Sequence, residues 1–504
     1  MPNISQFRRV KIVCTLGPSS NSAPMMRSLI DAGLDVARFN FSHGTHDVHE
    51  STFKTLREQA KKSGRAVASM QDLQGPKIRL GKLPATGIEI KAGDTILLYP
   101  EGASVKTSQT GKRLIPVSTE ICGPISKALK KGAMILFDDG KYSAEVKSVN
   151  PPEIVAEVKV GGKLSSNKGM NLPGSTLPIA SVTEKDYEDL KFGLKLGMDA
   201  IALSFVRSPK DIEEVKNFIR KTSNHKPMVI AKIEREEAVN VMEQIVDVTD
   251  GVLVARGDMA VEIGAERVPI VQKQLIRVCN EVGVPVITAT QMLESMISNP
   301  TPTRAEANDV ANAVFDGTDA VMLSAETASG QYPLEAVAMM SKVILEAEQF
   351  RRQYSRSPDL VPMTGSVVES IEFSASRIAD HVGAASIACM THSGVAARSL
   401  SKFRPLRPIV AITDNEEAMR KLAFVWGVQS VLIPDIVSTE DVFETVEKVM
   451  KSHKWAEIDD YVVVTAGIPT LRRGTTNMIK VHKMGSLMER AARSVKTKTA
   501  SRKA

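Results

Sequence analysis

The sequence predicts an α/β protein with a (β/α)₈ barrel, a small β-barrel lid domain inserted into it, and a C-terminal open-sheet α/β domain. Three observations indicate this fold. Between Val10 and Glu326, short β-branched runs alternate with segments of helical apolar spacing, as in a parallel sheet with crossover helices. One long gap in this alternation is rich in glycine and in alternating apolar and polar residues. A second, shorter alternation follows in the C-terminal third.

Composition limits the class of protein. With 504 residues, 43% of them hydrophobic, the chain is long enough for two or three domains with cores of their own. Its apolar runs are shorter than the roughly 18 residues that cross a bilayer, and its N-terminal sequence lacks a signal-peptide pattern. The four cysteines lie far apart, which is typical of reduced thiols. We therefore expect a cytoplasmic protein with no membrane partner.

The positive charge of the chain is concentrated at its end. The net charge is +7, and the last twelve residues, RSVKTKTASRKA, contain five basic residues and no acidic one. We therefore treat residues 485–504 as a basic tail and expect no nucleic-acid partner.

Eight predicted strands form the barrel (TIM barrel), which we assign to residues 1–79 and 177–350. They are residues 10–17, 35–42, 66–73, 200–206, 228–234, 251–258, 284–291 and 319–326. Segments such as EEAVNVMEQIVDV, between the fifth and sixth strands, have the apolar spacing of helices. A last helix begins at Pro333, because proline suits the first turn of a helix. In such a barrel, the carboxyl ends of the strands form the active face.

The gap after the third strand, residues 80–176, predicts an all-β insertion. Its sequence DDGK at 138–141 is a turn signal between two alternating segments. An insertion at this point would stand over the active face and could close as a lid. A passive decoration of the barrel would explain the same pattern.

The C-terminal domain is predicted over residues 351–484. Helical segments separate its predicted strands, which are residues 386–391, 408–413, 430–434, 461–467 and 478–483. This arrangement indicates an open α/β sheet.

The segment 228–263 contains the strongest candidate for a functional site. Lys232 and Glu234 alternate along one strand, so they face the same side, and the next strand ends at Gly257 and Asp258. A lysine and two carboxylates at the carboxyl ends of neighbouring strands could bind a divalent cation and an anion together. Solvated strand ends with ordinary salt bridges are the alternative.

Polar residues at the carboxyl ends of the other strands favour a functional site. Scattered salt bridges would not collect at one end of every strand. The residues are Arg38, Asn40, Ser42 and His43 after the second strand, Asp72 after the third, Ser204 and Arg207 after the fourth, Thr290 after the seventh, and Ser324 and Glu326 after the eighth.

Several long motifs resemble those of pyruvate kinases over nearly the whole chain. In order they are KIVCTLGPSS, ARFNFSHGTH, DLQGPKIRLG, NLPG, SFVRS, AKIERE, VARGDMAVEI, TATQMLESM and MLSAETASGQYP. The fold of that family, a barrel with a β lid and a C-terminal effector domain, matches the division above. The resemblance implies an enzyme of glycolysis that transfers the phosphoryl group of phosphoenolpyruvate to ADP, protonates the resulting enolate, and usually forms a homotetramer.

The resemblance also implies roles for single residues. Mg²⁺ or Mn²⁺ would bind to Glu234 and Asp258, and Lys232 would stabilise the phosphoryl group during transfer. The other implied roles are substrate binding for Arg38, Ser204, Gly257, Asp258 and Thr290, a proton relay near Thr290, Ser324 and Glu326, and nucleotide binding for Asn40, His43, Arg79 and Lys168. The backbone N–H groups of Gly257 and Asp258 open a helix, so they could take the substrate carboxylate.

One position departs from much of the family. Many members require K⁺, bound by groups that match Asn40, Ser42, Asp72 and Leu73, but Lys77 replaces a family glutamate here. Its ammonium can supply the positive charge itself, worth roughly 4 kcal/mol at about 4 Å with an effective dielectric near 20. We therefore expect activity without K⁺, as in the branch of the family that carries lysine in its GPKIR motif.

The sequence THSG at 391–394 is a candidate phosphate site in the C-terminal domain. Hydroxyls and free N–H groups at a helix start, beyond the carboxyl end of a parallel strand, can bind a phosphate, although a capping turn has the same composition. By similarity, Thr391, Ser393 and Gly394 would bind a phosphorylated effector, with Arg472 and Arg473 of the loop 467–475 beside it. The effector could be a sugar bisphosphate, a sugar monophosphate or AMP, and the sequence does not choose among them.

Two other functions fit parts of the pattern. A metal-dependent barrel lyase or aldolase for pyruvate-like acids would also use a metal-bound carboxylate pair, but it needs neither the lid with Lys168 nor the pair of Arg38 and Arg79. An inactive sensor of phosphorylated metabolites could share the scaffold. Retention of Lys232, Glu234, Asp258 and Thr290 together argues against the sensor.

Overall fold

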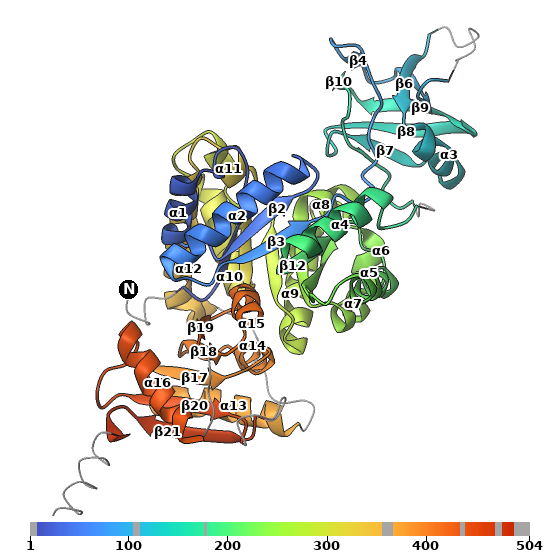
Figure 1. Cartoon of the computed structure of the whole chain (residues 1–504). Coiled ribbons are helices and arrows are strands. Elements are labelled where there is room, and N and C mark those ends of the chain that lie inside the picture. Colours follow the sequence, from blue (N-terminus) through green and yellow to red (C-terminus); the bar gives the residue numbers. More distant parts are fainter. Residues whose placement is uncertain are drawn as a thin grey trace, which may run out of the picture.

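Eight parallel strands close into a barrel at the centre of the molecule (Figure 1). The computed structural model describes residues 8–103, 111–175, 179–354, 366–433, 439–468 and 476–487. Within them the barrel order is β1-β16-β15-β14-β13-β12-β3-β2. The strands are β1 (Lys11–Thr15), β2 (Val36–Asn40), β3 (Ala68–Asp72), β12 (Ala200–Leu203), β13 (Met228–Ile233), β14 (Gly251–Ala255), β15 (Val286–Ala289) and β16 (Ala320–Leu323). All eight predicted strands are confirmed, and their carboxyl ends meet at one face.

Helices surround the barrel, and local sequence signals fix the ends of several of them. Thr183 and Asp186 form a reciprocal capping box at the start of α4, and Gly197 ends that helix with a positive φ of 77°. The helices are α1 (Ala23–Ala32), α2 (His46–Ser63), α4 (Glu184–Leu196), α5 (Pro209–Thr222), α6 (Glu236–Asn240), α7 (Met242–Val248), α8 (Arg256–Ile263), α9 (Val268–Val282), η3 (Glu294–Ile297), α10 (Arg304–Asp316), α11 (Ala325–Ala328) and α12 (Pro333–Tyr354). In the described part of the chain, no helix combines the length and apolar character needed to cross a bilayer.

The insertion between β3 and β12 forms the lid domain, which projects from the barrel (Figure 1). It has a six-stranded sheet of order β11-β7-β8-β9-β5-β6 and a pair, β10 with β4. The strands are β4 (Ile88–Ile90), β5 (Thr95–Pro100), β6 (Arg113–Val117), β7 (Met134–Phe137), β8 (Tyr142–Asn150), β9 (Glu153–Val160), β10 (Gly162–Leu164) and β11 (Met170–Asn171). Asp138 and Asp139, with φ of 50° and 56°, lie in the predicted turn between β7 and β8. The expectation of an all-β insertion is wrong at α3 (Thr119–Ala128), where Gly123 and Pro124 lower the helix propensity.

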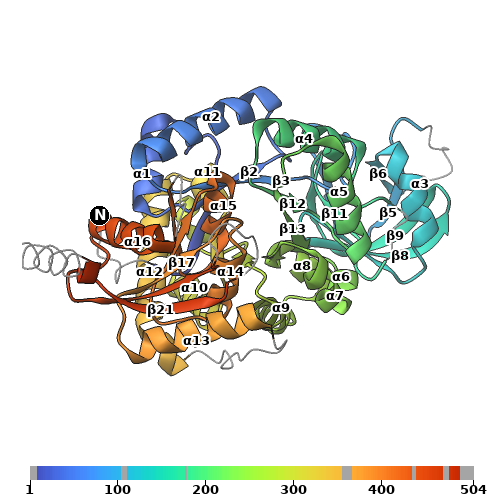
Figure 2. The ribbon, with the colours of Figure 1, turned by 60° about the horizontal axis from the view of Figure 1, so that its bottom comes forward.

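The C-terminal domain is an open α/β sheet of order β19-β18-β17-β20-β21, as predicted. Strand β21 is antiparallel to β20, and the other neighbours are parallel. The strands are β17 (Ser386–Met390), β18 (Ile409–Thr413), β19 (Val428–Leu432), β20 (Tyr461–Ala466) and β21 (Met478–Lys483). The helices are α13 (Val367–His381), α14 (Val395–Lys402), α15 (Glu416–Lys421), η4 (Leu422–Phe424) and α16 (Thr439–His453). Figure 2 shows this sheet in front of the barrel.

The C-terminal domain closes the amino end of the barrel. Ala423 and Phe424 of η4 belong to the same buried cluster as Val13, Met70 and Leu253 of the barrel interior. Phe424 is fully buried. The lid therefore arises at the carboxyl end of the barrel, while the C-terminal domain fills the opposite end.

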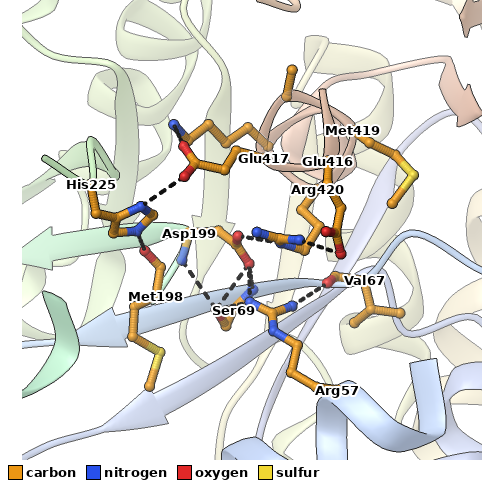
Figure 3. Close-up of polar contacts among 12 residues, drawn as sticks. Arg57, Val67, Ser69, Met198, Asp199, His225, Glu416, Glu417, Met419 and Arg420 are labelled. Carbon is orange, nitrogen blue, oxygen red and sulfur yellow. Dashed lines mark hydrogen bonds and ion pairs between the residues drawn. The ribbon is translucent and has the colours of Figure 1, made fainter. Parts of the chain in front are cut away.

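Ion pairs join the two domains around this contact. Asp199, which precedes β12, accepts hydrogen bonds from Arg420 Nε of α15 (2.7 Å) and from Arg57 Nη2 of α2 (2.6 Å), as Figure 3 shows. Burial alone would raise the pKa of Asp199, but the two arginines hold it below its ordinary value. A second pair links Arg404 to Asp319 at 2.9 Å.

Candidate active site

Lys232 lies at the centre of a buried ion-pair network at the carboxyl ends of the barrel strands. Its Nζ donates to Ser204 Oγ at 2.6 Å and lies 2.9 Å from Glu234 Oε1 and 3.2 Å from Asp72 Oδ1. Lys232 and Glu234 share a face because they alternate along β13 and its end. Burial alone would lower the pKa of Lys232, but Asp72 and Glu234 raise it above its ordinary value. The ammonium therefore stays charged.

Asp72 joins Lys232 to a second cation, Arg38. Arg38 Nε donates to Asp72 Oδ2 at 2.7 Å, and Arg38 Nη1 donates to Thr15 Oγ1 at 2.9 Å. Burial alone would raise the pKa of Asp72, but Lys232 and Arg38 hold it below its ordinary value. Sequence reasoning assigned Asp72 to the monovalent-cation region and missed this link. The available signal was the position of Asp72 at the carboxyl end of β3, the strand that follows the one carrying Arg38.

The carboxylates of Glu234 and Asp258 fit a divalent cation. Glu234 is 1% exposed, and its Oε2 accepts from Phe205 N at 2.7 Å. Its Oε1 touches Lys232 but has no partner with hydrogen-bond geometry in the described chain. Burial raises the pKa of Glu234 to about 6, which Lys232 opposes and Asp258 reinforces. An incompletely satisfied carboxylate close to a second one is the hard oxygen environment that Mg²⁺ prefers.

The further ligands of such a cation would come from outside this pair. Within the described ranges, no group of three or more His, Cys, Asp and Glu side chains is arranged to hold a metal. Asp258 stands in the first turn of α8 and its side chain is 29% exposed. Water or substrate oxygens can therefore complete the coordination, as is usual for Mg²⁺ at phosphate-transfer sites.

Thr290 meets the start of α8 directly. Its Oγ1 accepts a hydrogen bond from Gly257 N at 3.1 Å. A Cβ at Gly257 would lie 3.2 Å from Thr290 Cγ2, so this approach favours glycine. The Gly257 N–H, expected to bind the substrate carboxylate, is directed to Thr290. The Thr290 hydroxyl keeps its own hydrogen for donation to another group.

The carboxylate of Glu326 accepts hydrogen bonds from two backbone N–H groups. Its Oε2 accepts from Ser324 N at 2.6 Å, and its Oε1 accepts from Leu293 N at 3.3 Å. Burial raises the pKa of Glu326. The carboxylate thus ties the segment after β15 to the start of α11, next to Thr290.

The predicted nucleotide residues do not join the Lys232 network in this arrangement of the lid. Lys168 Nζ donates to Asp138 Oδ1 at 2.8 Å within the lid, and Arg79 Nη1 donates to Asn167 O at 3.1 Å. His43 is exposed after β2, and Asn40 Oδ1 accepts from Ser42 N at 3.2 Å. The two lid cations lie at the lid surface, where a nucleotide could reach them.

Lys77 lies between the lid and the carboxylate pair. Its Nζ is 3.8 Å from Asp258 Oδ1 and 3.9 Å from Asp139 Oδ1 of the lid turn. Leu73, which the sequence assigned to the monovalent-cation region, is buried, and its carbonyl accepts from Ser204 Oγ at 2.7 Å. A lysine ammonium is thus present next to the candidate metal site.

The candidate effector site has the backbone form of a helix start. Gly394 has a φ of 83° and precedes α14, and its N–H donates to Thr391 Oγ1 at 3.0 Å. Ser393 is exposed. Arg472 and Arg473 lie outside the described residues.

Comparisons with known proteins cover the barrel and the C-terminal domain. Residues 7–337 match the family model "Pyruvate kinase, barrel domain", and residues 369–482 match "Pyruvate kinase, alpha/beta domain". The chain is 44% identical over 487 residues to pyruvate kinase 2 of Synechocystis sp., covering 96% of this chain and 80% of the relative. It is 42% identical over 487 residues to the pyruvate kinase of Geobacillus stearothermophilus, covering 95% and 81%.

Proposed function

The chain belongs to the pyruvate kinase family, and we propose how its residues carry out the reaction of that family. The enzyme is a phosphotransferase that converts phosphoenolpyruvate and ADP to pyruvate and ATP, the last step of glycolysis. The phosphorus–oxygen bond to the enol oxygen breaks, and a new one forms to a β-phosphate oxygen of ADP. The enolate left behind takes up a proton at its methylene carbon.

Lys232 and Arg38 bind the phosphoryl group that moves. Their charges are fixed by Asp72 before substrate arrives, so little reorganisation is needed as charge develops on the phosphoryl oxygens. Ser204 orients the Lys232 ammonium through the hydrogen bond at 2.6 Å. This fixed pair of cations is the observation that carries the proposal.

Glu234 and Asp258 would hold a Mg²⁺ or Mn²⁺ ion. Such an ion would supply positive charge that stabilises the negative charge developing in the transfer. Thr290 donates its hydroxyl hydrogen to the substrate beside this site, since its oxygen already accepts from Gly257 N. Ser324 lies on the same rim, and Glu326 supports it through the backbone.

Closing of the lid would bring Lys168 and Arg79 to the phosphates of ADP. Both cations now bond to groups of the segment inserted between β3 and β12. His43 and Asn40 would complete the nucleotide site from β2. Closure would exclude water, so the phosphoryl group reaches ADP rather than water.

A coupled assay tests this function. Pyruvate formed from phosphoenolpyruvate, ADP and Mg²⁺ is reduced by lactate dehydrogenase, and the fall in NADH absorbance gives the rate. The enzyme should turn over only with all three components. No pyruvate under these conditions would contradict the assignment.

Turnover should not require K⁺. The Lys77 ammonium, 3.8 Å from Asp258, supplies a fixed positive charge next to the metal site. In buffer free of K⁺ we expect the rate to change by less than about threefold, which corresponds to under ~1 kcal/mol in barrier. Lys77→Glu should make the rate depend on K⁺. A hundredfold loss for the unchanged enzyme in K⁺-free buffer would overturn this.

A phosphorylated metabolite activates the enzyme at Thr391, Ser393 and Gly394. The exposed hydroxyl and the turn at the start of α14 support this site. Ser393→Asp should abolish activation by repelling the phosphate and leave the unactivated rate intact. Unchanged activation in a panel of phosphorylated effectors would count against the site.

The enzyme assembles as a homotetramer. Support comes from an open apolar groove between α10 and α12, lined by Phe315, Val343, Ala347 and the 47% exposed Phe350. Such a surface is typical of a subunit contact, and closed symmetric assemblies are common for soluble oligomers. Sedimentation analysis should give four times the chain mass of 54.6 kDa, and a monomer would contradict it.

A further inference from the structure

Arg256, the first residue of α8, is held against the loop that follows β15. Its Nε donates to Ala289 O at 3.0 Å, and its Nη2 donates to Thr290 O at 2.6 Å. The same Nη2 lies 2.7 Å from Met292 Sδ. On its other side, Nη1 donates to Asp309 Oδ1 of α10 at 2.8 Å. The guanidinium thus bridges the end of β15 to α10.

The loop that Arg256 holds has an unusual backbone. Thr290 and Gln291 have φ values of 71° and 54°, a region that residues other than glycine rarely adopt, β-branched ones such as threonine least of all. Such residues persist only where the surroundings impose the conformation, and they gather at functional sites. The two carbonyls that accept from Arg256, those of Ala289 and Thr290, lie where the chain leaves β15 and enters this conformation.

The conformation determines where the Thr290 hydroxyl lies. Thr290 Oγ1 accepts from Gly257 N, the residue directly after Arg256. Residue 256 therefore holds the Thr290 carbonyl while residue 257 holds its hydroxyl. Both the side chain and the backbone of Thr290 are therefore held by the first two residues of α8.

We propose that Arg256 is a positioning residue for the phosphoryl-transfer reaction, acting through Thr290. Its planar fork keeps Thr290 in the left-handed conformation, so that the hydroxyl is presented to the substrate. This rests on the proposed function, in which Thr290 contacts the substrate. Arg256 itself does not touch the reacting atoms, because its donors are directed to the loop carbonyls, Gln272 and Asp309.

A lysine at position 256 tests the guanidinium geometry apart from the positive charge. Arg256→Lys keeps the ion pair with Asp309, but a point charge cannot reproduce the bonds to two successive carbonyls. We expect kcat to fall about 10- to 100-fold, because displacing a substrate contact by about an ångström costs up to that much. The KM for ADP should stay within about twofold, since Thr290 is remote from the nucleotide phosphates in the proposed site.

A double-mutant cycle distinguishes positioning from general support of the fold. If Arg256 acts through Thr290, Arg256→Lys should cost less than about threefold in kcat when Thr290 is already alanine. The matched control is Asp309→Asn, which removes the ion pair and leaves both carbonyl contacts. It should change kcat by less than about threefold.

Three outcomes would overturn the proposal. They are an additive loss in the double variant, an equal loss in Asp309→Asn, and an unchanged kcat in a folded Arg256→Lys enzyme. If Arg256→Lys does not fold, as judged by circular dichroism, Arg256→Gln replaces it in the same cycle. Turnover of the unchanged enzyme tests the proposed function separately, and only the comparison among variants tests Arg256.

Discussion

At the scale of single residues, one buried carboxylate determines the electrostatics of the candidate site. Asp72 contacts both Lys232 and Arg38, and it is 1% exposed. Two like charges this close would repel each other without it. Both cations therefore depend on Asp72 for their position as well as for their charge balance.

Asp72→Asn should reduce kcat by about 10² to 10³, the range found when an oriented charge-stabilising group is lost. The KM for phosphoenolpyruvate should rise as well, because Arg38 and Lys232 would separate. The coupled assay gives both constants. Asp35→Asn is a matched control, since Asp35 is a buried carboxylate at the opposite end of the barrel, paired with Arg8 and Arg65. It should lower the melting temperature and leave kcat of the folded enzyme within about twofold; an equal kcat loss would contradict the account.

A second residue links stability to pH. Glu372 on α13 is fully buried, and neither of its carboxylate oxygens has a partner with hydrogen-bond geometry among the described residues. Burial raises the pKa of Glu372 to about 8, although Ser399 opposes the shift. The folded state thus binds the proton more tightly than the unfolded state. This contribution to stability is complete below pH 4.5, the ordinary value, and is lost as the pH rises to about 8.

Glu372→Gln should remove this pH dependence. Between pH 5 and about 8, the unchanged enzyme should lose unfolding free energy relative to the variant, by at most about 1.4 kcal/mol per pH unit. Its melting temperature should fall accordingly. Glu369→Gln, one turn earlier, should have the opposite effect at pH 8, because it breaks the pair with Lys402 at 2.7 Å. A Glu372→Gln variant that is less stable than the parent at pH 8 would contradict the buried-proton explanation.

At the scale of elements, α15 and η4 connect the C-terminal domain to the barrel. Arg420 and Arg57 meet on the two oxygens of Asp199 (Figure 3). Phe424 belongs to the buried cluster of the barrel interior. Removing one partner leaves Asp199 with unbalanced buried charge.

Arg420→Met should destabilise the protein, because Asp199 loses one of its two buried partners. The loss should be limited to about 1–3 kcal/mol, because Arg57 still pairs with Asp199. The melting temperature of the full chain measures it. Glu416→Gln is the control, because Glu416 pairs with the same arginine at 2.8 Å but its side chain is 67% exposed. Exposed pairs contribute under about 1 kcal/mol, so this variant should melt near the parent temperature. Equal effects of the two substitutions would contradict the importance of the buried pair.

Elements with strong periodicity could be predicted from the sequence. All eight barrel strands and the five strands of the C-terminal sheet follow runs of apolar residues bounded by turn signals. Helix α3 could not, because Gly123 and Pro124 interrupt its pattern and tertiary packing of Cys122 and Ile125 stabilises it instead.

Contacts between segments far apart in the chain could not be predicted from the sequence. Periodicity gives the face of a strand but not the register between strands, so it showed Lys232 and Glu234 together and not Asp72 with Arg38. The role of Phe424 depends on how one domain docks on another. The contacts of Arg256 and Gly257 with Thr290 depend on the backbone dihedrals of Thr290, which the sequence VARGD does not predict by itself.

At the scale of the whole molecule, the two ends of the barrel have different tasks. The lid arises beside the carboxyl ends of the strands, where the cations and carboxylates gather, and the C-terminal domain fills the amino end (Figures 1 and 2). The C-terminal domain contacts the amino end of the barrel through α15, η4 and the pair of Arg404 with Asp319. The strands of the barrel are the shortest covalent route between the two ends.

The Lys232 ammonium among Asp72, Glu234 and Ser204 is the centre of this account, and replacing it tests the account most directly. Lys232→Met should lower kcat in the coupled assay by at least about 10³, because the charge that stabilises the phosphoryl group in transit is gone. Calorimetry should still detect binding of phosphoenolpyruvate with Mg²⁺. A folded Lys232→Met enzyme that keeps kcat within about tenfold of the parent would contradict the account.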